Sequence, residues 1–101
     1  MSETLAGWAE TITLAEGVEA VVAVRRGEFG ELRFADGLRE PIELSRIPVN
    51  AIAAQLRAGF GSGAARCFLT QPGQPAVAVD RERGEPLIAL LQAAVAFSEG
   101  S

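Results

Sequence analysis

The chain contains no histidine, no lysine and no tyrosine, and Cys67 is its single cysteine among 101 residues. Ser-His-Asp and Cys-His catalysis need an imidazole base, and both Schiff-base chemistry and the phosphate-binding P-loop need a lysine. One cysteine without histidine cannot complete a usual zinc site. These absences predict a protein with no catalytic residue, no metal and no cofactor. A lone cysteine forms no internal disulfide, so we expect a reducing, cytoplasmic location.

Clustered positive charge is also missing. Nine arginines are scattered among thirteen acidic residues, and the net charge is −4. A surface that follows phosphates needs grouped cations, so nucleic acid is not an expected partner. No apolar run approaches the roughly 20 residues of a membrane span, and the first residues lack the basic and apolar regions of a signal peptide. Length and the 49% apolar content predict a single domain over residues 1–101.

The amino-terminal segment predicts a helix over about 3–15. Ser2 suits the N-cap position, and Gly17 can end the helix. Apolar residues recur there at helical spacing, namely Leu5, Trp8, Ala9 and Ile12. Thr11–Leu14 also alternates with β-favouring residues, so a strand over that stretch remains an alternative.

Three strands are expected next. Residues 18–26 are apolar on both faces for most of their length, which indicates a central strand. A turn at Gly27–Gly30 leads to a strand over 31–34, with Leu32 and Phe34 facing inward. Asp36-Gly37 predicts a type I′ hairpin turn into a third strand over 38–44.

The second helix is predicted over about 48–58, because Pro48 fits its first turn and an apolar stripe follows. The stripe consists of Val49, Ile52, Ala53, Leu56 and Phe60. Gly59–Gly63 resembles a phosphate loop in composition, but it follows a helix instead of preceding one. It is therefore interpreted as a helix C-cap.

A second hairpin and a last helix complete the chain. Strands over 65–71 and 74–80 flank the turn pair Pro72-Gly73. Residues 81–85 form a polar linker, and Pro86 opens a helix that runs to about Ser98. The predicted fold class is α+β, with the order helix–three strands–helix–two strands–helix and an antiparallel sheet with helices packed on it.

Three residues are candidates for binding a partner protein. With Val22 and Val24 in the core, Val21 and Ala23 face the other side of the sheet. Phe68 likewise points away from the face of its strand neighbours. Together they predict an apolar patch on the outer sheet face, which is a usual mark of an interaction site. The alternative is that the first helix covers them.

The last helix suggests an assembly. Gln92 is its only polar side chain before Ser98, and a helix that is apolar all round is covered on two sides. We therefore expect a homodimer in which Ile88 and Val95 lie at the interface. The alternatives are that alanines dilute an ordinary amphipathic helix, or that the first helix supplies the second cover.

The remaining chemically active side chains have ordinary explanations. Asp36 belongs to a turn, and Asp80, Glu82 and Glu85 lie with arginines in the polar linker, where solvation accounts for them. The Arg66-Cys67 pair places a cation next to a thiol, but neighbouring strand residues point to opposite faces. Cys67 is therefore interpreted as a buried structural cysteine.

In element order, small size and acidity, the chain resembles the class I type III secretion chaperones. The resemblance implies an acidic homodimer that holds an unfolded segment of another protein against apolar sheet patches. Roadblock-type dimeric scaffolds are similar but divide their strands differently. The expected function is a non-enzymatic protein-binding domain, a chaperone or adaptor. The alternatives are an acidic inhibitor or immunity-type protein with a basic partner, and a small enzyme that uses carboxylates or arginine.

Overall fold

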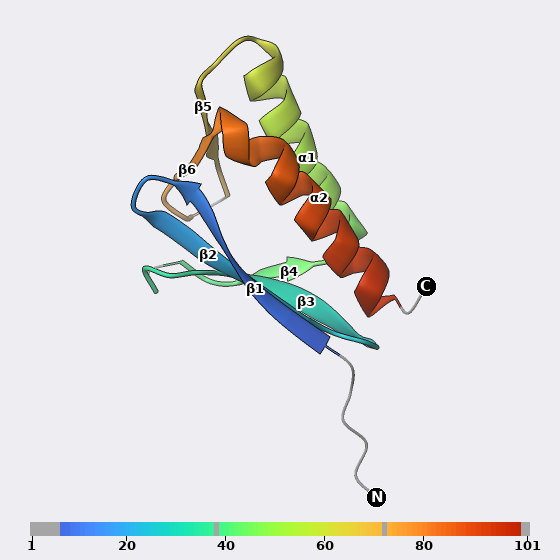
Figure 1. Cartoon of the computed structure of the whole chain (residues 1–101). Coiled ribbons are helices and arrows are strands. Elements are labelled where there is room, and N and C mark those ends of the chain that lie inside the picture. Colours follow the sequence, from blue (N-terminus) through green and yellow to red (C-terminus); the bar gives the residue numbers. More distant parts are fainter. Residues whose placement is uncertain (1–6, 38, 72, 100–101) are drawn as a thin grey trace, which may run out of the picture.

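Four strands, a helix, two strands and a second helix follow one another along the chain, and both sheets are antiparallel (Figure 1). The computed structural model describes residues 7–37, 39–71 and 73–99. The elements are β1 (Gly7–Ala15), β2 (Val18–Arg25), β3 (Glu28–Phe34), β4 (Ile42–Leu44), α1 (Arg46–Gly61), β5 (Arg66–Leu69), β6 (Val77–Asp80) and α2 (Arg81–Ser98). The predicted α+β class is confirmed. The predicted order differs at its first element.

That first element is a strand where the sequence predicted a helix over about 3–15. β1 pairs antiparallel with β2 from Gly7 to Ala15, so the helix is wrong from residue 7 onward. The alternative strand over Thr11–Leu14 was correct but too short. Trp8 and Ile12 lie at spacings that fit both periods, and pairing along the whole of β2 decides in favour of the strand.

The four-stranded sheet has the order β1-β2-β3-β4, and one of its faces forms the core. The core residues of the three later strands alternate as the sequence predicted, and they are Ala20, Val22, Val24, Leu32, Phe34, Ile42 and Leu44. The predicted turn at Gly27–Gly30 is wrong in its bounds. Arg25 pairs with Glu28, so the turn is tighter and Phe29 already belongs to β3.

The connection from β3 to β4 is longer than predicted. β4 begins at Ile42, and Leu32 pairs with Ile42, which leaves Ala35–Pro41 as the loop. Gly37 has a φ of +68°, but Asp36 does not have the positive φ that a type I′ turn requires, so that turn is wrong. Leu38, which was expected in the strand, lies outside the described residues.

Helix α1 confirms the predicted apolar stripe. Val49, Ile52, Ala53 and Leu56 are buried, and Phe60 is half-buried. The helix ends in a glycine-rich C-cap as expected, with the Gly63 N–H donating to the Phe60 carbonyl at 3.0 Å. Gly63 has a φ of +95°, a conformation that glycine adopts at little cost.

Helix α2 begins five residues earlier than predicted, because the polar segment 81–85 is its first turn. The Arg81 N–H donates to the Ala65 carbonyl at 2.9 Å, which anchors this turn beside β5. The Arg81 guanidinium also donates to the carbonyls of Phe60 and Ala64, at the end of α1. Pro86 lies inside the helix and is exposed to solvent.

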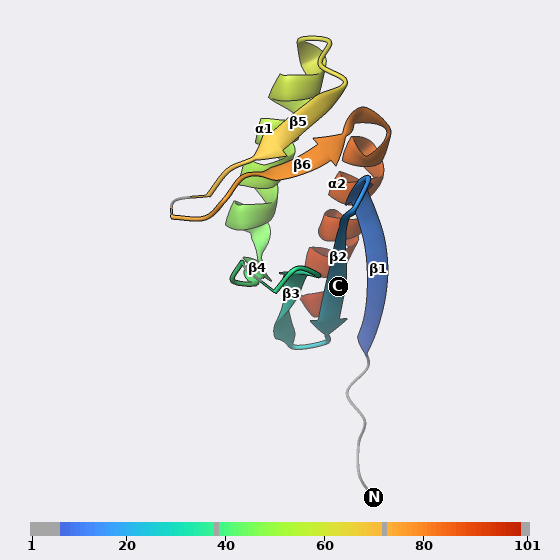
Figure 2. The same ribbon diagram turned by 90° about the vertical axis from the view of Figure 1, so that its left-hand side faces the viewer.

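Both helices lie on the same face of the sheets (Figure 2). α2 packs across β1, β2 and β3, while α1 packs beside α2 and against β4 and β5. The buried residues of all these elements form one hydrophobic core. The Gly27 N–H donates to the Ser98 carbonyl at 3.0 Å, which fixes the end of α2 to the β2–β3 turn.

Candidate functional site

The face of the four-stranded sheet that points away from the helices is here named the outer face. Its central residues are Ala9, Val21, Ala23, Arg25, Glu31 and Arg33. Val21 and Ala23 point to this face, as the alternation predicted, and both are half-buried. The first helix, which was the alternative cover for them, is β1 itself over residues 7–15. In the described ranges, no helix lies on the outer face.

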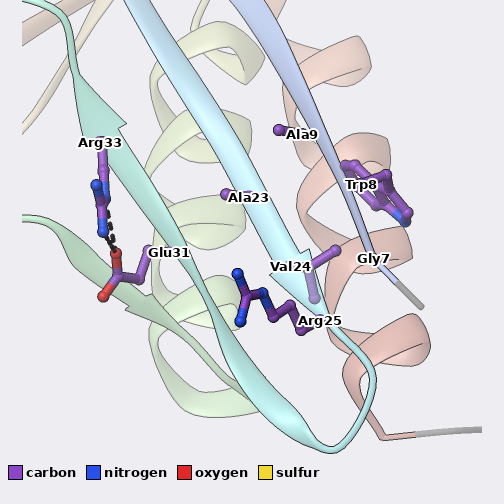
Figure 3. A pocket seen from close by; sticks show the side chains of 8 residues that line it. All are labelled: Gly7, Trp8, Ala9, Ala23, Val24, Arg25, Glu31 and Arg33. Atoms are coloured by element: carbon purple, nitrogen blue, oxygen red, sulfur yellow. Dashed lines mark hydrogen bonds and ion pairs between the residues drawn. The ribbon is translucent and has the colours of Figure 1, made fainter. Parts of the chain in front are cut away.

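The outer face carries small side chains together with charged side chains of both signs. Figure 3 shows Ala9 and Ala23 on adjacent strands and the ion pair of Glu31 with Arg33 on β3. The guanidinium Nε of Arg33 lies 2.7 Å from the carboxylate of Glu31. These residues line a depression of about 520 Å³ over the ends of the strands. The predicted apolar patch is therefore reduced here to a few small side chains between charges.

Phe68 lines a different depression, named here the Phe68 groove. The groove has a volume of about 630 Å³ and is lined by the β1–β2 turn, the end of β3 with its loop, and the β5–β6 hairpin. Its apolar lining includes Val18, Phe34, Phe68 and Ala78. Phe68 is 55% exposed, so most of its ring lies open to the groove or to solvent. The structure separates Phe68 from Val21 and Ala23, which do not line this groove.

Arg39 holds the rim of the Phe68 groove together. Its guanidinium donates to the carbonyls of Pro75 and Ala76, at 3.2 and 3.1 Å, and pairs with the carboxylate of Asp36. It also lies over the ring of Phe34, 5.7 Å from the ring centroid. One side chain therefore ties the β3–β4 loop to the β5–β6 hairpin. Nothing in the sequence pattern indicated this role of Arg39, because the two carbonyls to which it donates are 36 and 37 residues away.

The residues predicted at a dimer interface are inside the chain's own core. Ile88 is 1% exposed and Val95 is 7% exposed. The expectation that they lie at or beyond the edge of the helix–sheet contact is corrected by α1, which packs beside α2 and supplies the second cover. The exposed side of α2 instead carries small or polar residues such as Ala89, Gln92 and Ala93.

Three of the acidic side chains considered in the sequence, those of Asp36, Asp80 and Glu85, are paired with arginines. Asp80 accepts from Arg66 at 2.8 Å, and Glu85 lies 3.5 Å from Arg57. Among the described residues, Ser98 is the only buried polar or charged one, so every described carboxylate reaches solvent. No set of three or more acidic or cysteine side chains in the described ranges is arranged to hold a metal.

Cys67 is half-buried, not fully buried as predicted. Its thiol packs against the hydrophobic core, and Sγ lies 3.6 Å from the carbonyl oxygen of Gln55.

An ion pair between Arg46 and Glu99 joins the start of α1 to the end of α2. The guanidinium of Arg46 donates two hydrogen bonds to the carboxylate of Glu99, at 2.9 and 3.0 Å. The hydrogen bond from the Arg46 guanidinium lowers the pKa of Glu99 below its usual value of 4.5.

Comparison with protein-family models, with curated proteins and with solved structures finds no match to this chain. The first element in the described residues is a strand, whereas the element order on which the resemblance to class I type III secretion chaperones rested begins with a helix. No helix in the described residues has the length and apolar character that crossing a lipid bilayer requires.

Proposed function

We propose that this chain is a non-enzymatic protein-binding domain, an adaptor or chaperone, that receives an apolar side chain of another protein in the Phe68 groove. The observation that carries the proposal is the 55% exposure of Phe68 within a groove that has an apolar lining. Exposed aromatic side chains in a concave, partly apolar surface are typical anchors of protein interfaces.

The composition of the groove supports the same function. Val18, Phe34 and Ala78 provide an apolar floor, whereas Glu19 and Arg39 place charges of both signs at the rim. A binding surface commonly combines such an apolar centre with a polar border that orients the partner. Because Arg39 is held by two backbone carbonyls, the rim is formed before a partner arrives, which lowers the entropic cost of association.

Two other large apolar side chains are more exposed than Phe68 but lie elsewhere. Phe29 is 65% exposed on β3, and Ile47 is 82% exposed in the first turn of α1. Neither lines the Phe68 groove or the outer-face depression. Single exposed apolar residues are normal on protein surfaces, so these two serve as controls.

The proposal is tested with peptides selected from a random phage-displayed library on the immobilised domain. We expect the selected peptides to carry an apolar residue and to shift the backbone amide resonances of Val18, Phe34 and Ala78. Their affinity falls at least tenfold for Phe68→Ser and stays unchanged for the matched Phe29→Ser variant. Peptides that bind Phe68→Ser as tightly as the wild type, or that shift only resonances outside the groove, would refute the proposed function.

A further inference from the structure

The edge of the four-stranded sheet at β1 has no partner strand among the described residues. β1 is the first strand in the sheet order, and it pairs only with β2. β6 lies against β1 near its carboxyl end, where Leu14 and Ala15 are buried (Figure 1). The stretch Gly7–Thr13 is therefore a free edge, and it carries a single charge, at Glu10. Long edge strands with few charges favour pairing with another strand.

The direction of the backbone N–H and C=O groups alternates along each strand, and this alternation shows which groups of β1 point away from the sheet. The Ala35 N–H donates to the Glu19 carbonyl at 2.9 Å, so Glu19 directs its backbone groups toward β3. In an antiparallel ladder this direction alternates, so Val21 and Ala23 also bond to β3. Their opposite residues on β1 are Thr13, Thr11 and Ala9. The N–H and C=O groups of Ala9, Thr11 and Thr13 consequently point outward from the sheet.

The hydrophobic core is also open along this edge. Trp8 and Ile12 of β1 and Leu90 and Phe97 of α2 are all half-buried against the core. Phe97 and Trp8 meet edge to face, with ring centroids 6.1 Å apart, and Figure 3 shows Trp8 turned toward α2. Leu90 precedes Phe97 by about 10 Å along the helix, and Ile12 follows Trp8 by about 13 Å along the strand. The two pairs therefore form an apolar strip beside the free edge, which the exposed Glu10 interrupts between Trp8 and Ile12 on the same face of β1.

We infer that a second copy of this chain pairs with β1, antiparallel to it, on a twofold axis that passes through Thr11. The occupant is a second copy because the outward groups are self-complementary. With Thr11 opposite itself, Ala9 lies opposite Thr13 of the second copy, and each such pair exchanges both backbone hydrogen bonds. The result is one continuous sheet with four strands from each copy.

Glu10 selects this register. An axis through Glu10 would place the two Glu10 carboxylates directly opposite each other, and like charges in that position destabilise a strand pair. With the axis through Thr11, Glu10 lies opposite Ile12 of the second copy. The same arrangement brings the apolar side chains of the two strips closer across the axis and reduces their contact with water, while the two Glu10 carboxylates lie diagonal to each other. The surface is distinct from the Phe68 groove, so the inference does not depend on the proposed function.

The first test removes the outward N–H of Thr11. In Thr11→Pro the lost N–H does not bond to β2, and proline is tolerated on edge strands when its missing N–H faces solvent. We expect the wild type to sediment at twice the 10.6 kDa of one chain and Thr11→Pro to sediment as a folded monomer. Its dissociation constant rises roughly tenfold or more. Thr11→Lys, which places like charges together on the axis without altering the backbone, gives the same result.

The second test is a cross-link in a Cys67→Ser background. Opposite residues of a hydrogen-bonded pair have Cα atoms about 5.5 Å apart, within the range of a disulfide. Thr11→Cys is therefore expected to oxidise to a covalent dimer. Val21→Cys is the matched control on the same face, because the two copies of Val21 are separated by three strand spacings, about 14 Å. It is expected to remain a monomer on a non-reducing gel.

Three results would overturn the inference. The first is a wild-type chain that sediments as a monomer up to the highest soluble concentration, which would leave the edge to another protein. The second is a dimer that neither Thr11→Pro nor Thr11→Lys weakens. The third is a Val21→Cys variant that cross-links as readily as Thr11→Cys.

Discussion

The contact between α1 and β5 provides a sharp test of how tightly this core is packed. A Cβ atom added at Gly59 would lie 2.5 Å from Sγ of Cys67 and 3.2 Å from its Cβ. A Cβ added at Gly61, two residues later on the same helix, would meet nothing within 4 Å. Gly59→Ala therefore overpacks a defined site, and Gly61→Ala is its control.

The expected magnitudes follow from two opposing effects. Glycine to alanine inside a helix gains up to about 1 kcal/mol. Overpacking a core costs about 1–3 kcal/mol. We expect Gly59→Ala to lower the free energy of unfolding by about 1–2 kcal/mol and Gly61→Ala to leave it unchanged or slightly raised. Cys67→Ala alone removes one half-buried sulfur and costs about 1 kcal/mol.

The decisive quantity is the coupling between the two sites. In Gly59→Ala/Cys67→Ala the new methyl group occupies the space that the sulfur leaves, so the two costs do not add. Urea unfolding of the wild type, both single variants and the double variant should give a coupling energy of about 1–3 kcal/mol. Additivity within about 0.5 kcal/mol would show that Cys67 moves aside freely and that the packing argument is wrong. The same cycle with Gly61→Ala should be additive.

Two further predictions concern the helices. Changing Ile88 and Val95 together to Glu should unfold the chain, as measured by circular dichroism, because both side chains are buried in its own core. The control Ala93→Glu, on the exposed side of α2, should leave the chain folded. A double variant that is a folded monomer would contradict the assigned packing. Glu99→Gln should lower the free energy of unfolding at neutral pH. That difference should disappear as the pH falls below 4.5 through the lowered pKa of Glu99, because protonation removes the negative charge that pairs with Arg46. A difference that persists in acid would refute the ion pair.

The elements that the sequence predicted correctly are those whose local pattern of apolar residues fits only one kind of element. β2 was recognised from an apolar run on both faces over 18–26, with Val22 and Val24 placed in the core, and α1 was recognised from a stripe that includes Val49 and Leu56. In both cases the side chains that the pattern places inward are the buried ones. Local sequence suffices there because the period and the burial agree.

The errors arise where a distant segment decides the local structure. In β1, Trp8 and Ile12 fit a helix as well as a strand, and only the neighbouring β2 resolves the ambiguity. In α2, Pro86 indicated the start of a helix, but anchoring of Arg81 to Ala65 and to the end of α1 extends the helix by five residues. Neither contact has a signal in the local pattern.

Only Phe68 of the candidate site was predictable from the sequence; the other lining residues and the shape of the groove were not. The exposure of Phe68 follows from strand alternation, since Leu69 beside it is buried. The groove around Phe68 was not predictable, because three segments line it and Arg39 joins two of them across 36 residues of sequence. A pattern within one strand gives the direction of a side chain, but it carries no information about which loop lies opposite.

The change of the first element from helix to strand also alters the argument about function. A helix over about 3–15 was the alternative cover for Val21 and Ala23, and it would have ended the sheet at β2. As a strand, the same segment leaves the outer face uncovered and adds a free edge whose outward groups are those of Ala9, Thr11 and Thr13. The buried positions of Ile88 and Val95 remove the original reason to expect a dimer. The reason that replaces it is the unpaired edge, whose backbone groups have no intramolecular partner in the described residues and whose apolar strip stays half-exposed in a single copy.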